Sequence, residues 1–217
     1  MTTDNFKKRI ITSTALIILL FFVIFSKIAL LYSLIIIGVY SVLEFINLSQ
    51  NIFKKFISRV ISNILFTIFI FIYFTIFFYF SNFIQLKIIL FALLFGCIAS
   101  DIGGYIFGKI IKGPKISKIS PNKTLAGSFG SLILCSTTFT VSILFFTNTS
   151  SLLIMTTGLV TSVFCQLGDL FFSYLKRKAK KKDTGNILPG HGGILDRIDG
   201  ILLGIPSGYL FLLIFLR

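Results

Sequence analysis

The sequence predicts an all-α fold, a polytopic bundle of about seven transmembrane helices with a cytoplasmic N-terminus. Two observations support this prediction. The 217 residues are 55% hydrophobic and only 13% charged, and this charged share is about half of that in a soluble domain. The hydrophobic residues also form long runs, most of them long enough to cross the hydrocarbon core of a bilayer. The chain is therefore expected to be an integral membrane protein.

Seven apolar runs define the expected spans. They cover about residues 10–26, 28–48, 60–80, 84–108, 128–147, 151–175 and 201–216. Lys27 alone separates the first two runs, which predicts a tight turn on the outer side. The three cations at residues 7–9 precede the first run as in a signal peptide, but no small-x-small cleavage pattern follows Phe25. An uncleaved first helix is therefore expected.

The distribution of cations predicts the orientation of the spans. With the N-terminus inside, 18 of the 21 Lys and Arg residues fall in cytoplasmic segments, leaving only Lys27, Lys87 and Arg217 elsewhere. This asymmetry follows the positive-inside rule. It accounts for the net charge of +14 without a nucleic-acid partner. We expect a protein of the inner (cytoplasmic) membrane whose active site faces the cytoplasm.

The chain divides chemically into two regions. Residues 1–96 form an apolar transmembrane scaffold with only two acids, Asp4 and Glu44. Residues 97–217 form the expected catalytic region, in which the other five acids are joined by loops containing glycine and proline. The three cysteines lie inside apolar runs with no paired spacing and no nearby histidine, which excludes a disulfide framework and a zinc site.

Asp169 lies near the cytoplasmic end of the sixth predicted span. A carboxylate there costs up to about 2.5–3.5 kcal/mol on insertion scales, so it needs a cation, a partner or water. A bound metal would supply the cation, and a snorkelling or lysine-paired carboxylate is the alternative. Asp196 and Asp199 are spaced i and i+3 on one helical face. Two hard oxygen ligands there suit Mg²⁺, and Arg197 between them could bind a phosphate through its guanidinium.

The loop at residues 113–124 contains lysines, hydroxyls and two prolines just before the fifth predicted span. Helix N-termini and ammonium groups attract phosphate, although a solvated basic loop is the alternative. No Walker A sequence occurs. Gly104 and Gly108, four residues apart, predict close helix packing rather than a dinucleotide site, since no strand precedes them.

Several motifs cover roughly residues 97–200. They read Ser100-Asp101-x-Gly103-Gly104-Tyr105-x₂-Gly108, Ser120-Pro121-x-Lys123-Thr124-x₂-Gly127, Gly168-Asp169 and Ser173-x₂-Lys176-Arg177-x₅-Asp183-x-Gly185-x₃-Pro189-Gly190-His191-Gly192-Gly193-x₂-Asp196-Arg197-x-Asp199. Together they resemble the signature of the phosphatidate cytidylyltransferase (CDP-diacylglycerol synthase) family.

The resemblance implies an enzyme that joins CTP and phosphatidic acid to give CDP-diacylglycerol and pyrophosphate. It also implies a homodimer in membrane lipid, with Mg²⁺ and a monovalent cation such as K⁺ as cofactors. The implied metal ligands are Asp169 and Asp196, joined by Asp101 and Asp199 as ligands or as groups behind them. The implied catalytic residues are Asp169, Asp196, Lys176, Arg177, Arg197, His191 and Asp183. The implied substrate-binding residues are Ser120, Lys123, Thr124, Asp101 and Tyr105.

In this reading Lys123, Lys176, Arg177 and Arg197 bind phosphates, and His191 and Asp183 lie near the site without an assigned role. His191 could instead only shape its turn. Ala126 stands where the family usually carries Glu or Gln. Two other functions stay open: a CTP-dependent polyprenol or phytol kinase, and an ion-coupled transporter that uses Asp101 and Asp169.

Overall fold

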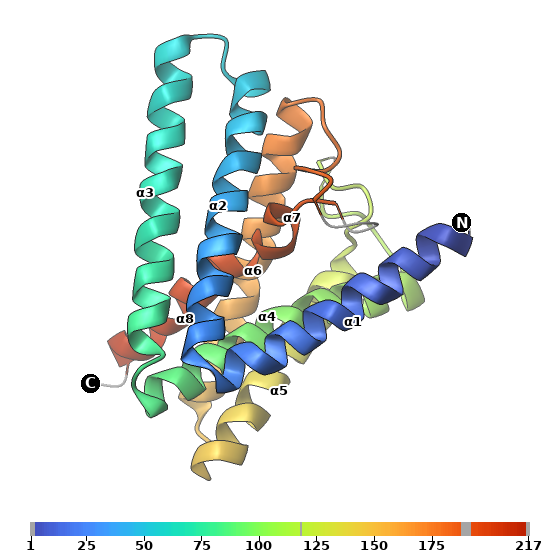
Figure 1. Ribbon diagram of the computed structural model, residues 1–217. Helices are drawn as coiled ribbons and strands as arrows, with labels where there is room; N and C mark the ends of the chain where they lie inside the picture. The colour runs from blue at the N-terminus through green and yellow to red at the C-terminus, as the bar shows by residue number, and fades with distance from the viewer. Residues whose placement is uncertain (1–2, 118, 188–191, 216–217) are drawn as a thin grey trace. The chain divides into compact units, whose positions relative to one another are not determined.

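Helices form almost all of the regular structure. A computed structural model describes residues 3–117, 119–187 and 192–215 (Figure 1). Within them the helices are α1 (Thr3–Phe25), α2 (Lys27–Ile52), α3 (Phe56–Phe80), α4 (Ile84–Ile110), α5 (Leu125–Thr147), α6 (Leu152–Lys178), α7 (Leu195–Ile198) and α8 (Ile201–Phe215). The described residues form no strand; an isolated β-bridge joins Lys115 and Thr124, and Gly192 also has the geometry of a bridge residue. The all-α prediction is confirmed.

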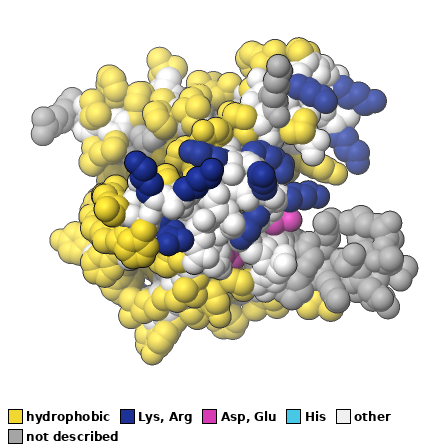
Figure 2. Space-filling model, turned by 90° about the horizontal axis from the view of Figure 1, so that it is seen from above, with side chains coloured by type: hydrophobic (Ala, Val, Ile, Leu, Met, Phe, Trp, Pro, Cys, Tyr) yellow, Lys and Arg dark blue, Asp and Glu magenta, His cyan; other side chains and the backbone are white. Residues whose placement is uncertain are grey.

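The lengths and compositions of the helices agree with about seven membrane spans. Among the described residues, six segments are long and apolar enough to cross a bilayer: α2, α3, α4, α5, α6 and Leu195–Phe215. α1 contributes a shorter apolar stretch, Ile11–Phe25. Hydrophobic side chains cover much of the surface in Figure 2. The chain is an integral membrane protein.

The chain forms two compact units. The first comprises residues 1–79 and 175–198, and the second comprises residues 80–174 and 199–217. The boundary therefore lies at the end of α3, within α6, and between α7 and the start of α8. Each unit contains some of the residues that the sequence marks as functional.

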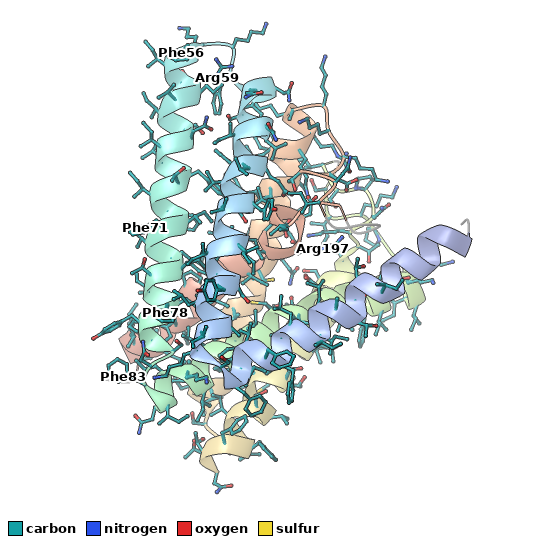
Figure 3. The ribbon with its side chains drawn as sticks, viewed as in Figure 1. Phe56, Arg59, Phe71, Phe78, Phe83 and Arg197 are labelled. Carbon is teal, nitrogen blue, oxygen red and sulfur yellow. The ribbon has the colours of Figure 1, made fainter. Side chains whose placement is uncertain are left out.

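In the first unit, α2 and α3 pack against each other along an aromatic and small-residue contact. The rings of Phe45 and Phe66 stack with their centroids 3.9 Å apart. A Cβ on Gly38 would lie 3.1 Å from the Phe74 ring, so glycine there allows the close approach. Other α3 side chains point outward, including the 71% exposed Phe71 (Figure 3). Such exposure is expected of a helix that faces lipid.

In the second unit, small residues bring α4 and α5 into close contact. A Cβ on Gly103 would lie 2.5 Å from the Gly130 carbonyl oxygen, and one on Gly127 would lie 2.7 Å from the Gly104 carbonyl oxygen. A Cβ on Gly104 would lie 2.8 Å from Ser131 Oγ, and one on Gly108 would lie 3.1 Å from Thr124 Oγ1, which confirms that these two glycines belong to a packing surface. Three nearly fully buried thiols lie inside this unit: Cys97, Cys135 and Cys165.

Candidate active site

Each unit contains one carboxylate–lysine pair made of predicted site residues. In the first unit Lys176 Nζ lies 2.7 Å from Asp196 Oδ1, and in the second Lys123 Nζ lies 2.6 Å from Asp169 Oδ2. The side chains of the first pair are only 12% and 7% exposed, against 31% and 21% for the second. The sequence marked both acids as metal ligands and both lysines as phosphate-binding. In the structure each acid is paired with one of these lysines.

Asp196 has a dense set of hydrogen-bond donors. Its Oδ2 accepts bonds from the Thr184 amide at 2.8 Å, the Thr184 hydroxyl at 3.0 Å and the Gly193 amide at 3.1 Å. Lys176 takes Oδ1. A carboxylate offers about four acceptor positions. The Thr184 hydroxyl has one hydrogen, which Asp196 shares with Glu44 Oε2 at 2.7 Å, so three donors and this shared one surround Asp196. Oδ1, whose printed partner is Lys176, is therefore the oxygen of Asp196 that is more open to a cation.

The end of α6 places Lys176 beside Asp196. The helix closes with the Lys181 amide donating to the Lys176 carbonyl at 2.9 Å and the Lys180 amide donating to the Arg177 carbonyl at 3.0 Å. Lys180 adopts φ 55°, which with these two bonds is a Schellman termination. The chain leaves the helix axis at this point. Lys176 thus lies in the last turn of α6, where it donates to Asp196.

The loop before α5 places Lys123 beside Asp169. The Ile116 amide donates to the Lys123 carbonyl at 3.0 Å, and the Leu125 amide donates to the Pro114 carbonyl at 3.0 Å. The loop is thus folded back on itself. Thr124 is the N-cap of α5 and accepts a bond from the Gly127 amide at 3.1 Å. Since the cap fixes the residue that follows Lys123, the lysine is held at the start of the helix.

The chain segment at Asp199 and Gly200 packs against α6 beside Asp169. A Cβ on Gly200 would lie 2.7 Å from Cys165 Sγ and 3.3 Å from Asp169 Oδ1. Asp199 itself is 7% exposed, and its Oδ1 accepts a bond from the Gly200 amide at 2.9 Å. Because Asp199 is buried, it is better placed to support the predicted metal-binding residues than to bind a metal directly.

The other predicted site residues are less enclosed. Asp101 is exposed on α4, and Tyr105 is 68% exposed with Lys109 Nζ 5.6 Å from its ring centroid. Ser120 accepts a bond from the Lys123 amide at 3.1 Å through its carbonyl oxygen. Asp101 and Tyr105 are therefore accessible to a ligand in a way that Asp196 is not.

Around the first pair, Asp183 is exposed, and a Cβ on Gly192 would lie 3.5 Å from Asp183 Cβ and 3.3 Å from Asp196 Oδ2. The structure thus brings Asp183 and Asp196 close to the same glycine. Arg177 donates to the Lys181 carbonyl at 3.4 Å, and Arg197 is exposed on α7 (Figure 3). His191 lies outside the described residues.

Three polar residues that the sequence analysis passed over also belong here. Glu44, on α2, accepts three hydrogen bonds from the segments around Asp196. Thr184 bonds to both acids. Gln166, three residues before Asp169, bonds to Ser128 and Ser162. Glu44 could have been found, because an acid inside an apolar span marks a candidate functional site, and that reasoning was applied to Asp101 and Asp169 but not to Glu44.

The donor set fits a hard divalent cation that is held partly by its substrate. Among the described residues, no three His, Cys, Asp or Glu side chains lie together as a ready-made metal site. Mg²⁺ does not need such a cluster, because it is usually held by one or two carboxylates and by substrate phosphates. Asp169, partly exposed and bonded to Lys123 through Oδ2, fits this role. Asp196 fits it through Oδ1.

Comparison with known proteins assigns the family. A model of the Cytidylyltransferase family matches residues 3–215, which is nearly the whole chain. The chain belongs to the cytidylyltransferase family. This confirms the family that the motifs around Asp169 and Asp196 resemble.

Individual relatives of the family agree with this assignment. A phosphatidate cytidylyltransferase from Staphylococcus haemolyticus is 44% identical over 124 residues, or 56% of this chain and 47% of the relative. One from Mycobacterium leprae is 42% identical over 115 residues, or 52% of this chain and 36% of the relative. One from Staphylococcus aureus is 43% identical over 124 residues. The matched region thus spans about half or less of the length of these relatives.

Proposed function

We propose that this protein transfers the cytidylyl group of CTP to phosphatidic acid, giving CDP-diacylglycerol and pyrophosphate for phospholipid synthesis. The observation that carries the proposal is the family match across residues 3–215. The names of the relatives support the choice of phosphatidic acid as the acceptor. The two lysine–carboxylate pairs support it further, because they provide the charges that a triphosphate and a metal require.

The chemistry needs charge neutralisation more than a general base. The phosphate monoester of phosphatidic acid is anionic at neutral pH, so one of its oxygens can attack the α-phosphorus of CTP directly. A P–O bond forms there while the bond to the β-phosphate oxygen breaks, and the electron pair leaves with pyrophosphate. Lys123, Lys176, Arg177 and Arg197 are proposed to bind the phosphates and to stabilise the charge that accumulates on their oxygens. Asp183 and His191 are proposed to lie beside this site.

Mg²⁺ is the proposed cofactor, with K⁺ as a second cation. Asp169 and Asp196 would hold Mg²⁺, with Asp101 and Asp199 as further ligands or as groups behind them. When bound, Mg²⁺ would offset negative charge on the triphosphate and on the leaving pyrophosphate. Lys123 and Lys176 would then exchange a carboxylate partner for a phosphate. Each lysine already lies beside one of these carboxylates.

The lipid substrate is proposed to stay in the membrane throughout. The acyl chains would remain among lipids while the headgroup enters the polar region lined by Ser120, Thr124 and Tyr105. The concentration of cations in segments that the positive-inside rule places in the cytoplasm supports an active site on that side of the inner membrane. A homodimer is the proposed assembly.

Product analysis with labelled CTP tests the function. The purified protein is given Mg²⁺, CTP labelled at either the α- or the γ-phosphorus, and either phosphatidic acid or, in a parallel reaction, a polyprenol. We expect α-label in the lipid product and γ-label in pyrophosphate. Transfer of γ-label to a lipid alcohol, with release of CDP, would identify a kinase instead. Ion uptake into proteoliposomes without any CTP turnover would identify a transporter.

A further inference from the structure

Glu44 lies in α2, within the region that its composition marks as inert scaffold. The residue is 2% exposed. An acid inside an apolar span is costly unless hydrogen bonds or charges compensate it. Its burial therefore requires specific partners, and these partners come from a distant part of the chain.

The partners of Glu44 all belong to the segments that surround Asp196. The Ile194 amide donates to Oε1 at 3.0 Å, and the Leu195 amide donates to Oε2 at 2.9 Å. The Thr184 hydroxyl also lies 2.7 Å from Oε2. One carboxyl group on α2 thus holds both the segment at residue 184 and the segment at residues 194–195.

These same segments make most of the hydrogen bonds to Asp196. Thr184 contributes its amide and its hydroxyl, and Gly193 contributes its amide. The Thr184 hydroxyl lies between the two acids, 2.7 Å from Glu44 Oε2 and 3.0 Å from Asp196 Oδ2. Movement of the Glu44 carboxylate would therefore move the donors that orient Asp196.

The glycines of the motif fit the same arrangement. A Cβ on Gly185 would lie 2.5 Å from Glu44 Oε1. A Cβ on Gly193 would overlap both the Thr184 hydroxyl and the Glu44 carboxylate. The backbone closes around this acid so tightly that two positions of the loop have no room for a side chain. Glu44 is thus built into the loop that carries Asp196.

We infer that Glu44 is a positioning residue: from α2 it fixes the 184 and 193–195 segments, and through them the orientation of the Asp196 carboxylate. This inference rests on the proposed function for its effect on turnover. Residues that orient a metal-binding group from behind change metal affinity or activity by about 10–100-fold when they are replaced. Glu44 is expected to act in this way without touching substrate.

Glu44→Gln is the first test. Glutamine keeps one acceptor oxygen but turns an NH₂ group towards a donor of the loop. We expect the Mg²⁺ concentration for half-maximal activity to rise about 10–100-fold, with partial rescue at high Mg²⁺. The KM for phosphatidic acid should stay within about twofold. Glu44→Asp keeps the negative charge on a side chain that is one methylene shorter. Its Mg²⁺ concentration for half-maximal activity should lie between those of the wild type and Glu44→Gln.

Leu48→Ala is the matched control. Leu48 is fully buried on the same helix, one turn from Glu44, and its truncation opens a cavity while the carboxylate stays in place. We expect a lower melting temperature with an unchanged Mg²⁺ requirement. An equal shift of the Mg²⁺ requirement in Leu48→Ala, or none in Glu44→Gln, would overturn the inference.

Hydrogen–deuterium exchange provides a readout that needs no turnover. The Ile194 and Leu195 amides bond to Glu44, so a peptide covering residues 192–198 should exchange about tenfold faster in Glu44→Gln and not in Leu48→Ala. If the wild-type protein transfers no cytidylyl group, the proposed function fails, and exchange alone then decides the positioning role. Wild-type protection of this peptide in Glu44→Gln would overturn it.

Discussion

The two carboxylate–lysine pairs differ in burial, and this difference predicts unequal costs for neutralising their acids. In Asp196→Asn, the 12% exposed Lys176 loses its counter-charge, and an NH₂ group replaces one of the two oxygens that accept four bonds. Breaking a buried pair on one side costs about 3–5 kcal/mol. The Lys123–Asp169 pair is 31% and 21% exposed, so solvent screens it. Asp169→Asn should cost no more than about 1 kcal/mol.

Thermal unfolding in detergent measures this difference. At roughly 2–4 °C per kcal/mol for a chain of this size, Asp196→Asn should lower the melting temperature by about 6–20 °C and Asp169→Asn by no more than about 4 °C. The chain contains no tryptophan, so helical circular dichroism is the suitable signal. Lys176→Met with Asp196→Asn should recover part of the loss, because the unpaired cation is then removed as well. Equal shifts for the two single acid variants would refute the reasoning from burial.

The remaining predictions concern the packing and the basic segment around the site. Gly200→Ala should destabilise the second unit, since its Cβ would lie 2.7 Å from Cys165 Sγ and 3.0 Å from the Cys165 carbonyl oxygen; a thiol-reactive dye, which reaches the buried cysteines only on unfolding, should react at a lower temperature than in the wild type. Lys180→Gly should leave activity within about twofold and keep or raise the melting temperature, because Lys180 has φ 55° and glycine adopts this conformation without strain; a large activity loss would place the phosphate site at Lys180. Lys180→Ala should be similarly mild in activity assays.

The sequence predicted the helices well because apolar runs and their cationic flanks are local signals. It also showed that Asp169 needs a cation, but not which one: the lysine that pairs with it lies 46 positions earlier in the chain. No local pattern encodes such a contact. The loop at residues 113–124 was recognised by its prolines and lysines, whereas its folded-back shape depends on bonds such as that between Ile116 and Lys123.

The role of Glu44 was missed for the same physical reason. Its partners Ile194 and Leu195 are 150 and 151 positions away. They donate through their backbone amides, so their residue types do not indicate the contact. The glycines at 185 and 193 were visible in the sequence, but the group that approaches them was not. The composition predicts that residues 1–96 form a scaffold and residues 97–217 a catalytic region, and this division stays a prediction.

Binding of Mn²⁺ in the presence of CTP, followed by electron paramagnetic resonance, tests the central claim most directly, because Mn²⁺ replaces Mg²⁺ at oxygen ligands. The account predicts that the wild type and Lys180→Gly bind Mn²⁺ with CTP, and that Asp169→Asn and Asp196→Asn each lose this binding while remaining folded. Wild-type Mn²⁺ affinity in either acid variant would contradict the claim that both carboxylates serve one metal–nucleotide site.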